Sequence, residues 1–299
     1  MKEEKAFEGV FPAVITPFGK EGNIDEHRMG DFLDYMVEQG VHGIYLLGTN
    51  GEAPLLTFEE KKKIIDVAME RVDGRVPVIA GTMCNSTKKT IRLSKYAEEK
   101  GADAVHVIVP YYYPVGDEGF KEHIKKITDK IGIPVFLYSI PQFTGSEIET
   151  STISELAGIK NVLGLKDSSG DVEWLYKTLV DVRKKREDFV FFGGNDSLIL
   201  TYLKMGGDGA VTAVGNAFPE LVVDIYEKYK TGNIEEAERK QRKVLEIKKI
   251  FRKYPVMSAV KGALKVRGHD YGNLRKPLHT LDRREMKTLE EELKEIDVI

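Results

Sequence analysis

The chain has 299 residues, of which 41% are hydrophobic and 31% charged, and its formal net charge is −3. This length excludes three ordinary domains and allows two small domains or one large α/β barrel. The hydrophobic fraction excludes a wholly disordered chain. The 45 basic residues nearly balance the 48 acidic ones, and no long basic run occurs. We therefore expect neither nucleic acid nor a membrane as a partner.

The number and spacing of the cysteines and histidines limit which disulfides and metal sites the chain can form. The lone Cys84 excludes a disulfide within the chain and is typical of a reducing compartment. The N-terminus has no apolar signal-peptide core, and no stretch approaches the roughly 18 apolar residues of a membrane span. We therefore expect a cytoplasmic protein. The six histidines form no HxH or HExxH pair, so no metal site is expected.

A short apolar run followed by an amphipathic helical stretch recurs from the N-terminus to about residue 231. Near-continuous apolar runs are typical of strands buried on both faces of a parallel sheet. The stretches between them place charged residues on one helical face. The predicted strands are 10–18, 43–48, 76–82, 104–109, 134–140, 162–166, 189–193 and 210–215, and the helices between them include 58–72, 88–100, 119–131 and 172–185.

Eight strands alternating with helices favour a (β/α)8 TIM barrel over an open doubly wound sheet. A Rossmann-like sheet is the alternative, although no GxGxxG follows the first strand. We predict the barrel over residues 1–231. Over residues 232–299 we predict a C-terminal helical extension packed on the barrel, not an independent domain. Its helical stretches are 233–253, 256–266 and 282–296, with no strand between them.

Catalytic groups of a barrel gather where its strands end, and Lys166 ends the apolar run 162–165. We therefore expect its side chain inside the barrel or just above it. Burial favours the neutral amine form of a lysine, which can attack a carbonyl carbon and form a Schiff base. The alternatives are a solvated strand-end lysine or an ion pair with Asp167.

Tyrosines end two neighbouring segments. Tyr138 ends the strand before that of Lys166, so its phenol can lie over the same cavity and shuttle a proton. Tyr111, Tyr112 and Tyr113 lie on the preceding loop. Packing in an interface is the alternative role for any of these three.

Two glycine-containing turns and several lysine-rich helices complete the pattern. The turn GTNGE at 48–52 can hold a carboxylate with backbone N–H groups and the Thr49 hydroxyl, although Asn-Gly is also an ordinary turn dipeptide. Gly193 and Gly194 permit close approach of a ligand, or form a plain loop. Lysine- and arginine-rich helical segments such as 61–63 and 183–186 are expected to be solvated faces.

Several motifs occur together in a fixed order. They are Pro17-Phe18, GTNGE at 48–52, PYYYP at 110–114, YSIPQFTG at 138–145, GLKDSSGD at 164–171, GGND at 193–196 and GGDGAVTAVGN at 206–216. In these motifs the chain, from about residue 9 to its C-terminus, resembles the family of dihydrodipicolinate synthase and N-acetylneuraminate lyase. These are class I pyruvate-dependent aldolases on a (β/α)8 barrel.

The resemblance implies roles for particular residues. Lys166 matches the lysine that forms a Schiff base with pyruvate or with the pyruvyl end of the substrate, and Tyr138 matches the proton shuttle. Thr49 and Tyr112 match the relay partners of that shuttle, the tyrosine being lent by a neighbouring subunit. The substrate-binding positions implied are Gly48, Asn50, Gly51, Phe143, Gly194 and Val211. The resemblance implies no metal or organic cofactor, and a homotetramer built from dimers.

Departures from the family pattern concern the substrate. Phe143 occupies the position where dihydrodipicolinate synthases place an arginine for the second substrate's carboxylate. In sialic acid lyases an Asp-Glu pair follows the seventh strand, where this chain has Asp196-Ser197. Asn50 and Ser139 replace the usual Thr and Asn. The combination of GxNGE and YSxP is similar to aldolases for 4-hydroxy-2-oxoglutarate and 2-keto-3-deoxy sugar acids.

We therefore expect a class I aldolase that cleaves or forms a 2-keto-3-deoxy acid, with pyruvate and an aldehyde as its other substrates or products. One alternative is 4-hydroxy-tetrahydrodipicolinate (dihydrodipicolinate) synthase, which condenses pyruvate with aspartate semialdehyde. Another is a non-catalytic barrel that binds sugar acids as a regulator. A dehydratase outcome through the same imine and a metal-dependent aldolase are the remaining alternatives.

Overall fold

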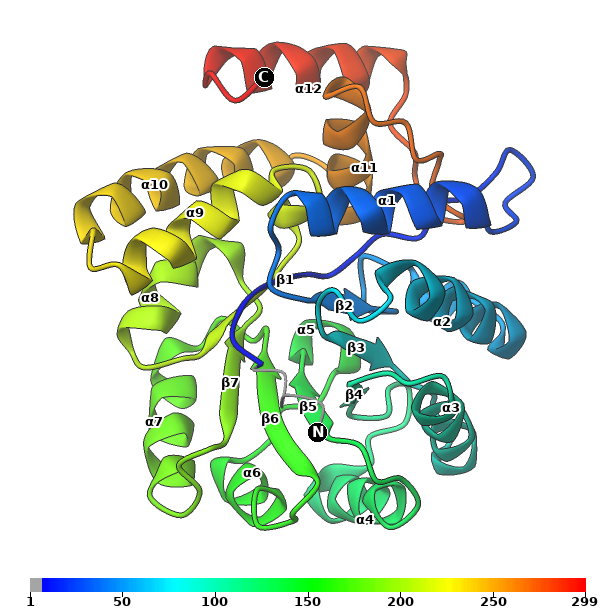
Figure 1. The fold of residues 1–299 in the computed structure, drawn as a ribbon, viewed down its shortest axis with the longest axis vertical. Helices are drawn as coiled ribbons and strands as arrows, with labels where there is room; N and C mark the ends of the chain where they lie inside the picture. Colours follow the sequence, from blue (N-terminus) through cyan, green and yellow to red (C-terminus); the bar gives the residue numbers. More distant parts are fainter. Residues whose placement is uncertain (1–6) are drawn as a thin grey trace.

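Eight parallel strands lie at the centre of the molecule, as the computed structural model shows for residues 7–299 (Figure 1). They hydrogen-bond in the order β1-β8-β7-β6-β5-β4-β3-β2, and a parallel bridge between Ala13 and Tyr45 brings the two edge strands together. The predicted TIM barrel is thus confirmed. The strands are β1 (Gly9–Pro12), β2 (Ile44–Leu46), β3 (Val78–Gly81), β4 (Ala104–Ile108), β5 (Val135–Ser139), β6 (Val162–Asp167), β7 (Val190–Gly193) and β8 (Gly209–Thr212).

Helices surround the strands on the outside (Figure 1). Helix α2 shows why they form where they do: Thr57 and Glu60 make a capping box at its start, and Ile64, Ile65 and Ala68 face the core. The other barrel helices are α1 (Glu26–Glu38), α3 (Thr87–Glu99), α4 (Gly116–Thr128), α6 (Thr150–Leu156), α7 (Val172–Arg183), α8 (Ile199–Lys204) and α9 (Pro219–Lys230), with α2 at Phe58–Val72. Shorter pieces are α5 (Pro141–Thr144) and the 3-10 turns η1 (Ala53–Leu55), η2 (Asp196–Leu198) and η3 (Val214–Asn216).

The first and last predicted strands, 10–18 and 210–215, were too long. The Ala13 N–H still donates to the Thr212 carbonyl oxygen of β8, but the backbone then leaves this ladder, and the Val14 N–H donates to the Tyr45 carbonyl oxygen. After Thr212 the chain turns, because the Thr212 hydroxyl oxygen accepts the N–H of Gly215 at 3.0 Å. Both departures occur at the carboxyl ends of the strands, where irregular backbone makes room for a site.

The barrel interior has its own apolar cluster, separate from the core between strands and helices. Its rings pack closely: Phe192 lies 5.0 Å from Phe11 and 5.7 Å from Phe136, measured between centroids. Side chains alternate along a strand, so the residue two positions after an inward-facing one also faces inward. Tyr138 follows Phe136 in this way on β5, and Lys166 follows Gly164, the register partner of Phe136, on β6, so both lie above the apolar cluster. The cluster comprises Phe11, Ala13, Tyr45, Ile79, Ala104, Phe136, Phe192 and Val211.

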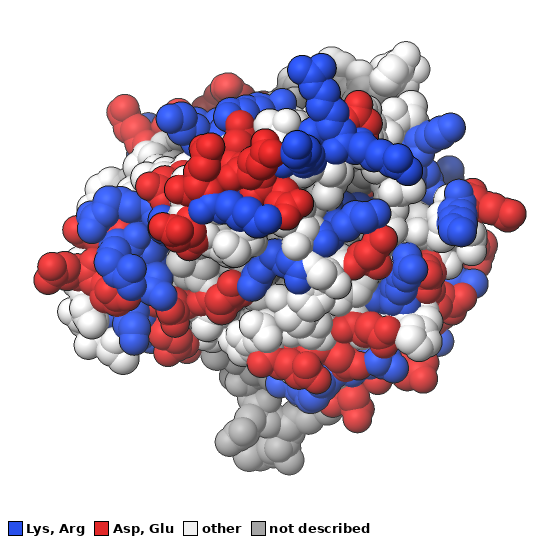
Figure 2. Space-filling model, turned by 90° about the horizontal axis from the view of Figure 1, so that it is seen from above, with Lys and Arg blue, Asp and Glu red and all other residues white. Residues whose placement is uncertain are grey.

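Opposite charges are mixed on the surface. On the face drawn in Figure 2, Lys and Arg side chains lie beside Asp and Glu side chains, and neither sign forms a continuous field. Within residues 7–299, no helix combines the length and apolar character needed to cross a membrane.

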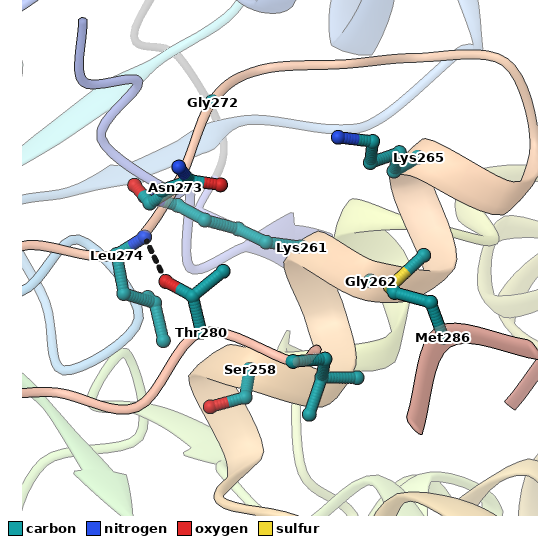
Figure 3. Close-up of a pocket in the computed structure, with 10 residues that line it drawn as sticks. Ser258, Lys261, Gly262, Lys265, Gly272, Asn273, Leu274, Thr280 and Met286 are labelled. Atoms are coloured by element: carbon teal, nitrogen blue, oxygen red, sulfur yellow. Dashed lines mark hydrogen bonds between the residues drawn. The ribbon is translucent and has the colours of Figure 1, made fainter. Parts of the chain in front are cut away.

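The C-terminal helices α10 (Ile234–Phe251), α11 (Val256–Val266) and α12 (Arg283–Glu295) follow α9 without an intervening strand. Lys261 of α11 reaches toward the loop at Asn273 (Figure 3), donates to the Asn273 and Thr16 carbonyl oxygens, and pairs with Glu52 at 2.8 Å. These contacts join the extension to the barrel. We propose that residues 1–231 make up the barrel and residues 232–299 the helical extension. Residues 1–6 lie outside the described residues.

Candidate active site

A cavity of about 280 Å³ opens at the carboxyl ends of the strands, where the sequence places the catalytic groups. Most of the predicted site residues line it, namely Thr49, Asn50, Tyr138, Phe143, Lys166, Gly194 and Val211. The same wall includes Ser168, Ser169, Asn195, Asp196, Gln142 and Lys248. Among residues 7–299, no group of three or more His, Cys, Asp or Glu side chains is arranged to hold a metal ion.

Lys166 and Tyr138 face each other across neighbouring strands. They are register partners on β6 and β5, and the Lys166 Nζ atom lies 3.8 Å from the centroid of the Tyr138 ring. Both side chains are buried, with 3% and 2% exposure, yet both line the cavity. A primary amine and a phenol are therefore held together at the base of an accessible pocket.

The two alternatives for Lys166 were a solvated side chain and an ion pair with Asp167, and the structure contradicts both. Lys166 is buried, and within the described chain no carboxylate lies at ion-pair distance from its ammonium group. The Asp167 carboxylate instead accepts the Ser169 N–H and hydroxyl at 3.0 Å each. Burial raises the pKa of Asp167 to about 6, against the opposing effect of hydrogen bonds from Ser169 and Ser139.

A stacked pair of rings lies below the amine. The Tyr45 ring centroid is 4.5 Å from Lys166 Nζ, and the imidazole of His106 stacks on Tyr45 at 4.0 Å. His106 Nε2 bonds the Leu46 carbonyl oxygen at 3.0 Å. Burial, together with the nearby Lys166 charge, lowers the pKa of His106 to about 3. The amine therefore lies between two tyrosine rings and close to an uncharged imidazole.

Gly194 directly follows the neighbouring strand β7 and lies beside Lys166. Its N–H donates to the Asp167 carbonyl oxygen at 2.6 Å. A Cβ atom at this position would lie 2.0 Å from Ser168 Oγ and 3.0 Å from Lys166 Cε. Of the two roles considered for Gly194, close approach fits this geometry, because only glycine leaves room beside the amine.

The GTNGE turn lies on the other side of the cavity. Glu52 has a left-handed φ of 56°, and its N–H bonds the Thr49 carbonyl oxygen inside the turn. The Gly51 carbonyl oxygen accepts the Thr16 hydroxyl at 2.7 Å. By contrast, the N–H groups of Thr49, Asn50 and Gly51 have no partner within the described chain. Gly48 and Gly51 shape this turn without lining the cavity. Consecutive free N–H groups are the donor set that a carboxylate requires.

Tyr112 is the predicted site residue that the chain does not bring into the cavity. It is 83% exposed, has a φ of 81°, and its ring contacts only that of Tyr113 at 4.9 Å within the described chain. Positive φ is unfavourable for a tyrosine, so the backbone holds the ring outward at some conformational cost. Its proposed role therefore requires a second copy of the chain.

Sequence reasoning missed the contribution of the C-terminal helices. Lys248 on α10, and Val256 and Met257 at the start of α11, line the cavity, although nothing in their local pattern indicates a strand end. The expectation of solvated faces also fails at Lys61, which is buried and donates to the Met83 carbonyl oxygen, and at Arg186, which binds carbonyl oxygens of the 157–162 loop. Buried lysines on amphipathic helices are the residues that periodicity alone does not identify.

Comparison with known proteins covers nearly the whole chain. The model of the dihydrodipicolinate synthetase family matches residues 6–296. A DapA-like lyase of Halobacterium salinarum is 40% identical over 97% of this chain and 94% of its own length. The 4-hydroxy-tetrahydrodipicolinate synthase of Bacillus subtilis is 37% identical over 97% of this chain and 99% of its own.

Solved structures agree with these sequences. YagE of Escherichia coli K12, a prophage protein of the dihydrodipicolinic acid synthase family solved in complex with pyruvate, superposes with a TM-score of 0.94. It is 30% identical and covers 98% of this chain and 99% of its own. Dihydrodipicolinate synthase of Thermotoga maritima gives a TM-score of 0.93 at 33% identity over 98% and 99% of the two chains. The chain belongs to the dihydrodipicolinate synthetase family, whose members are pyruvate-dependent class I aldolases and lyases.

Proposed function

We propose that the protein is a Schiff-base-forming aldolase that cleaves a 2-keto-3-deoxy acid to pyruvate and an aldehyde, or forms the acid from them. One observation carries the proposal: the Lys166 amine lies 3.8 Å from the centre of the Tyr138 ring at the base of an accessible cavity. A lysine that is buried but reachable is suited to attack on a carbonyl carbon.

In the cleavage direction, the Lys166 amine adds to the C2 carbonyl carbon and a carbinolamine forms. Tyr138 moves protons so that the C2 oxygen departs as water, leaving a protonated imine. The C4 hydroxyl then loses its proton toward Tyr138 while the C3–C4 bond breaks, and its electron pair passes into the imine. The aldehyde leaves, C3 of the resulting enamine takes up a proton, and water releases pyruvate from Lys166.

The remaining predicted residues bind the substrate in this proposal. The N–H groups of the 49–51 segment and the Asn50 side chain hold the pyruvyl carboxylate, and Thr49 also orients Tyr138. Gly194 and Val211 leave room for the pyruvyl unit, and Phe143 forms an apolar side of the aldehyde end. No metal or organic cofactor takes part in any of these steps.

Tyr112 supports the oligomeric part of the proposal. A homotetramer built from dimers lets each chain lend Tyr112 to its neighbour's Tyr138, which accounts for an aromatic ring that is 83% exposed. A dihydrodipicolinate synthase variant described as monomeric also shares this fold, with a TM-score of 0.93 at 32% identity, so the fold itself does not require assembly. The cytoplasmic location stays a prediction.

Borohydride reduction tests the mechanism. The protein is incubated with pyruvate, reduced, digested and analysed by mass spectrometry, with Lys166→Ala and the surface variant Lys249→Ala as comparisons. We expect a pyruvyl adduct on Lys166 in the wild-type protein and in Lys249→Ala, and none in Lys166→Ala. An unmodified Lys166 under these conditions would contradict Schiff-base chemistry.

4-Hydroxy-tetrahydrodipicolinate synthase is the second candidate, favoured by the Bacillus subtilis relative that carries this name. Phe143 opposes it, since its ring lines the cavity and offers no donor to a second carboxylate. The two functions separate in one experiment, in which pyruvate is mixed with aspartate semialdehyde, glyceraldehyde, glycolaldehyde or glyoxylate and consumption of each aldehyde is followed. Turnover confined to aspartate semialdehyde would favour the synthase.

A further inference from the structure

Lys248 introduces a positive charge into the cavity from outside the barrel. Its side chain is 17% exposed, and its Nζ atom lies 3.4 Å from Asp196 Oδ2. Of the residues lining the cavity, Lys166 and Lys248 are the cationic ones and Asp196 is the acidic one. In the proposed function Lys166 forms the imine, so Lys248 is the cationic side chain of the cavity that is left to bind another group of the substrate.

Asp196 is already saturated by residues 212–214 at the end of β8 and by Lys248. Its Oδ1 atom accepts the Thr212 hydroxyl and the N–H of Ala213, and its Oδ2 atom accepts the N–H of Val214 at 3.4 Å in addition to Lys248. A carboxylate has about four lone-pair sites, so Asp196 has little capacity left to bind a ligand hydroxyl. The free hydrogen-bonding capacity at this end of the cavity therefore consists of donors.

Lys248, by contrast, is under-satisfied. An ammonium group has three N–H donors, and within the described chain Asp196 is its only partner at ion-pair distance. The Lys248 side chain is 17% exposed, and burial of a lysine is costly where its N–H donors stay unpaired. Lys248 is not needed to attach α10 to residues 196–200. Gln241 already does so, because it accepts the Leu200 N–H and donates to the Asp196 carbonyl oxygen.

We propose that Lys248 binds an anionic group at the end of the aldehyde substrate distant from the carbonyl, so that the enzyme prefers aldehydes carrying a terminal carboxylate or phosphate. This inference rests on the proposed function. An ammonium group binds an anionic acceptor more strongly than a neutral hydroxyl oxygen, which separates this class from neutral sugars. A carboxylate and a phosphate both present oxyanions, and either group can supply the anion that Lys248 binds.

Matched aldehyde pairs test the inference. Succinic semialdehyde and butyraldehyde differ by a terminal carboxylate, and glyceraldehyde 3-phosphate and glyceraldehyde differ by a phosphate. We expect the wild-type protein to show a higher kcat/KM for the anionic member of at least one pair, and Lys248→Met to reduce that preference by about 10- to 100-fold. The pair that responds identifies the terminal group.

Two further variants test whether the charge at position 248 is responsible for the preference. Lys248→Arg retains the charge and should retain most of the preference. Lys249→Met makes the same charge change at the next, exposed position of α10 and should leave the preference unaltered. Equal kcat/KM within both pairs for the wild type, or an unchanged preference in Lys248→Met, would overturn the inference.

Borohydride trapping distinguishes failure of this inference from failure of the proposed function. The pyruvate adduct on Lys166 still forms in Lys248→Met if Lys248 acts only on the aldehyde. A wild-type protein that forms the adduct but shows no preference refutes the anion site alone. A wild-type protein that forms no adduct refutes the proposed function, and the inference that rests on it.

Discussion

Lys166 and Tyr138 are register partners on neighbouring parallel strands, and 3.8 Å separates the lysine Nζ atom from the centre of the tyrosine ring. Pairing on the ladder fixes their relative height, and the two-residue alternation of each strand turns both side chains inward. Backbone hydrogen bonds thus hold the amine and the phenol in register, and neither depends on a flexible loop for its position.

We expect Tyr138→Phe to lower kcat by roughly 10²- to 10⁴-fold, the usual contribution of general acid–base catalysis. The ring is 2% exposed and its packing is retained in phenylalanine, so the fold should be preserved. Steady-state kinetics and circular dichroism of the purified variant measure both quantities. Near-native turnover would show that another group carries the proton.

Tyr45 is expected to stabilise the positive charge of the protonated imine that forms on Lys166, because its ring lies 4.5 Å from Nζ. Tyr45→Leu should slow formation of the borohydride-trapped pyruvate adduct by about 2- to 30-fold, the range of a cation–π contact. Tyr45→Phe retains the ring and should behave nearly as the wild type. If both variants slow the reaction equally, the hydroxyl and not the ring is responsible.

Gly194→Ala should damage the site by crowding. The added Cβ atom would lie 2.0 Å from Ser168 Oγ and 2.8 Å from the Asp167 carbonyl oxygen, so the backbone or Ser168 must move. We expect a loss of about 1–3 kcal/mol in the free energy of unfolding and a larger proportional loss of kcat/KM, since Lys166 shifts as well. Urea unfolding and kinetics on one preparation check this, and unchanged values for both would refute the close approach.

Lys261→Met should destabilise the fold strongly, because it leaves the buried Glu52 carboxylate without its ammonium partner. Removing one partner of a buried pair costs about 3–5 kcal/mol in the free energy of unfolding. Lys265→Met, on the same helix, removes an exposed pair with Asp270 and should cost about 1 kcal/mol or less. Urea denaturation of both variants gives the comparison, and similar losses would contradict it.

His106 should make the fold sensitive to acid. Its folded-state pKa is about 3, below the ordinary value of 6.5, so below pH 6.5 the unfolded chain binds a proton that the folded chain does not. The free energy of unfolding should therefore fall, through this group, by about 1.4 kcal/mol per pH unit between pH 6.5 and roughly 3. Above pH 6.5 the group contributes no pH dependence.

His106→Phe retains an aromatic ring but has no proton to bind. Urea titrations between pH 4 and 7 should give a shallower pH dependence in this variant than in the wild-type protein, by about one proton. His123, whose pKa burial lowers to about 4, titrates in both proteins and cancels in the comparison. Parallel pH profiles of the two proteins would contradict the assignment.

The sequence predicts the carboxyl ends of β5, β6 and β7 to within one residue, because apolar runs mark buried strands and the residues that close them lie at the site. Lys166, Tyr138 and Gly194 were found in this way. Tyr45 and His106 were not, since both lie within apolar runs, where a polar atom gives no periodic signal. Lys248 was missed because a lysine on an amphipathic helix indicates solvent, and its position over the cavity depends on how α10 packs against the barrel.

The ion pair between Glu52 and Lys261 joins residues that are 209 positions apart. A ribosome releases the GTNGE turn early and Lys261 much later, so the turn first exists without the partner that neutralises its buried carboxylate. The strands around Lys166 can pair before then, while the segment proposed to hold the pyruvyl carboxylate is not yet locked. A segment proposed to bind the substrate is therefore translated early but gains its charge partner only once α11 has been made.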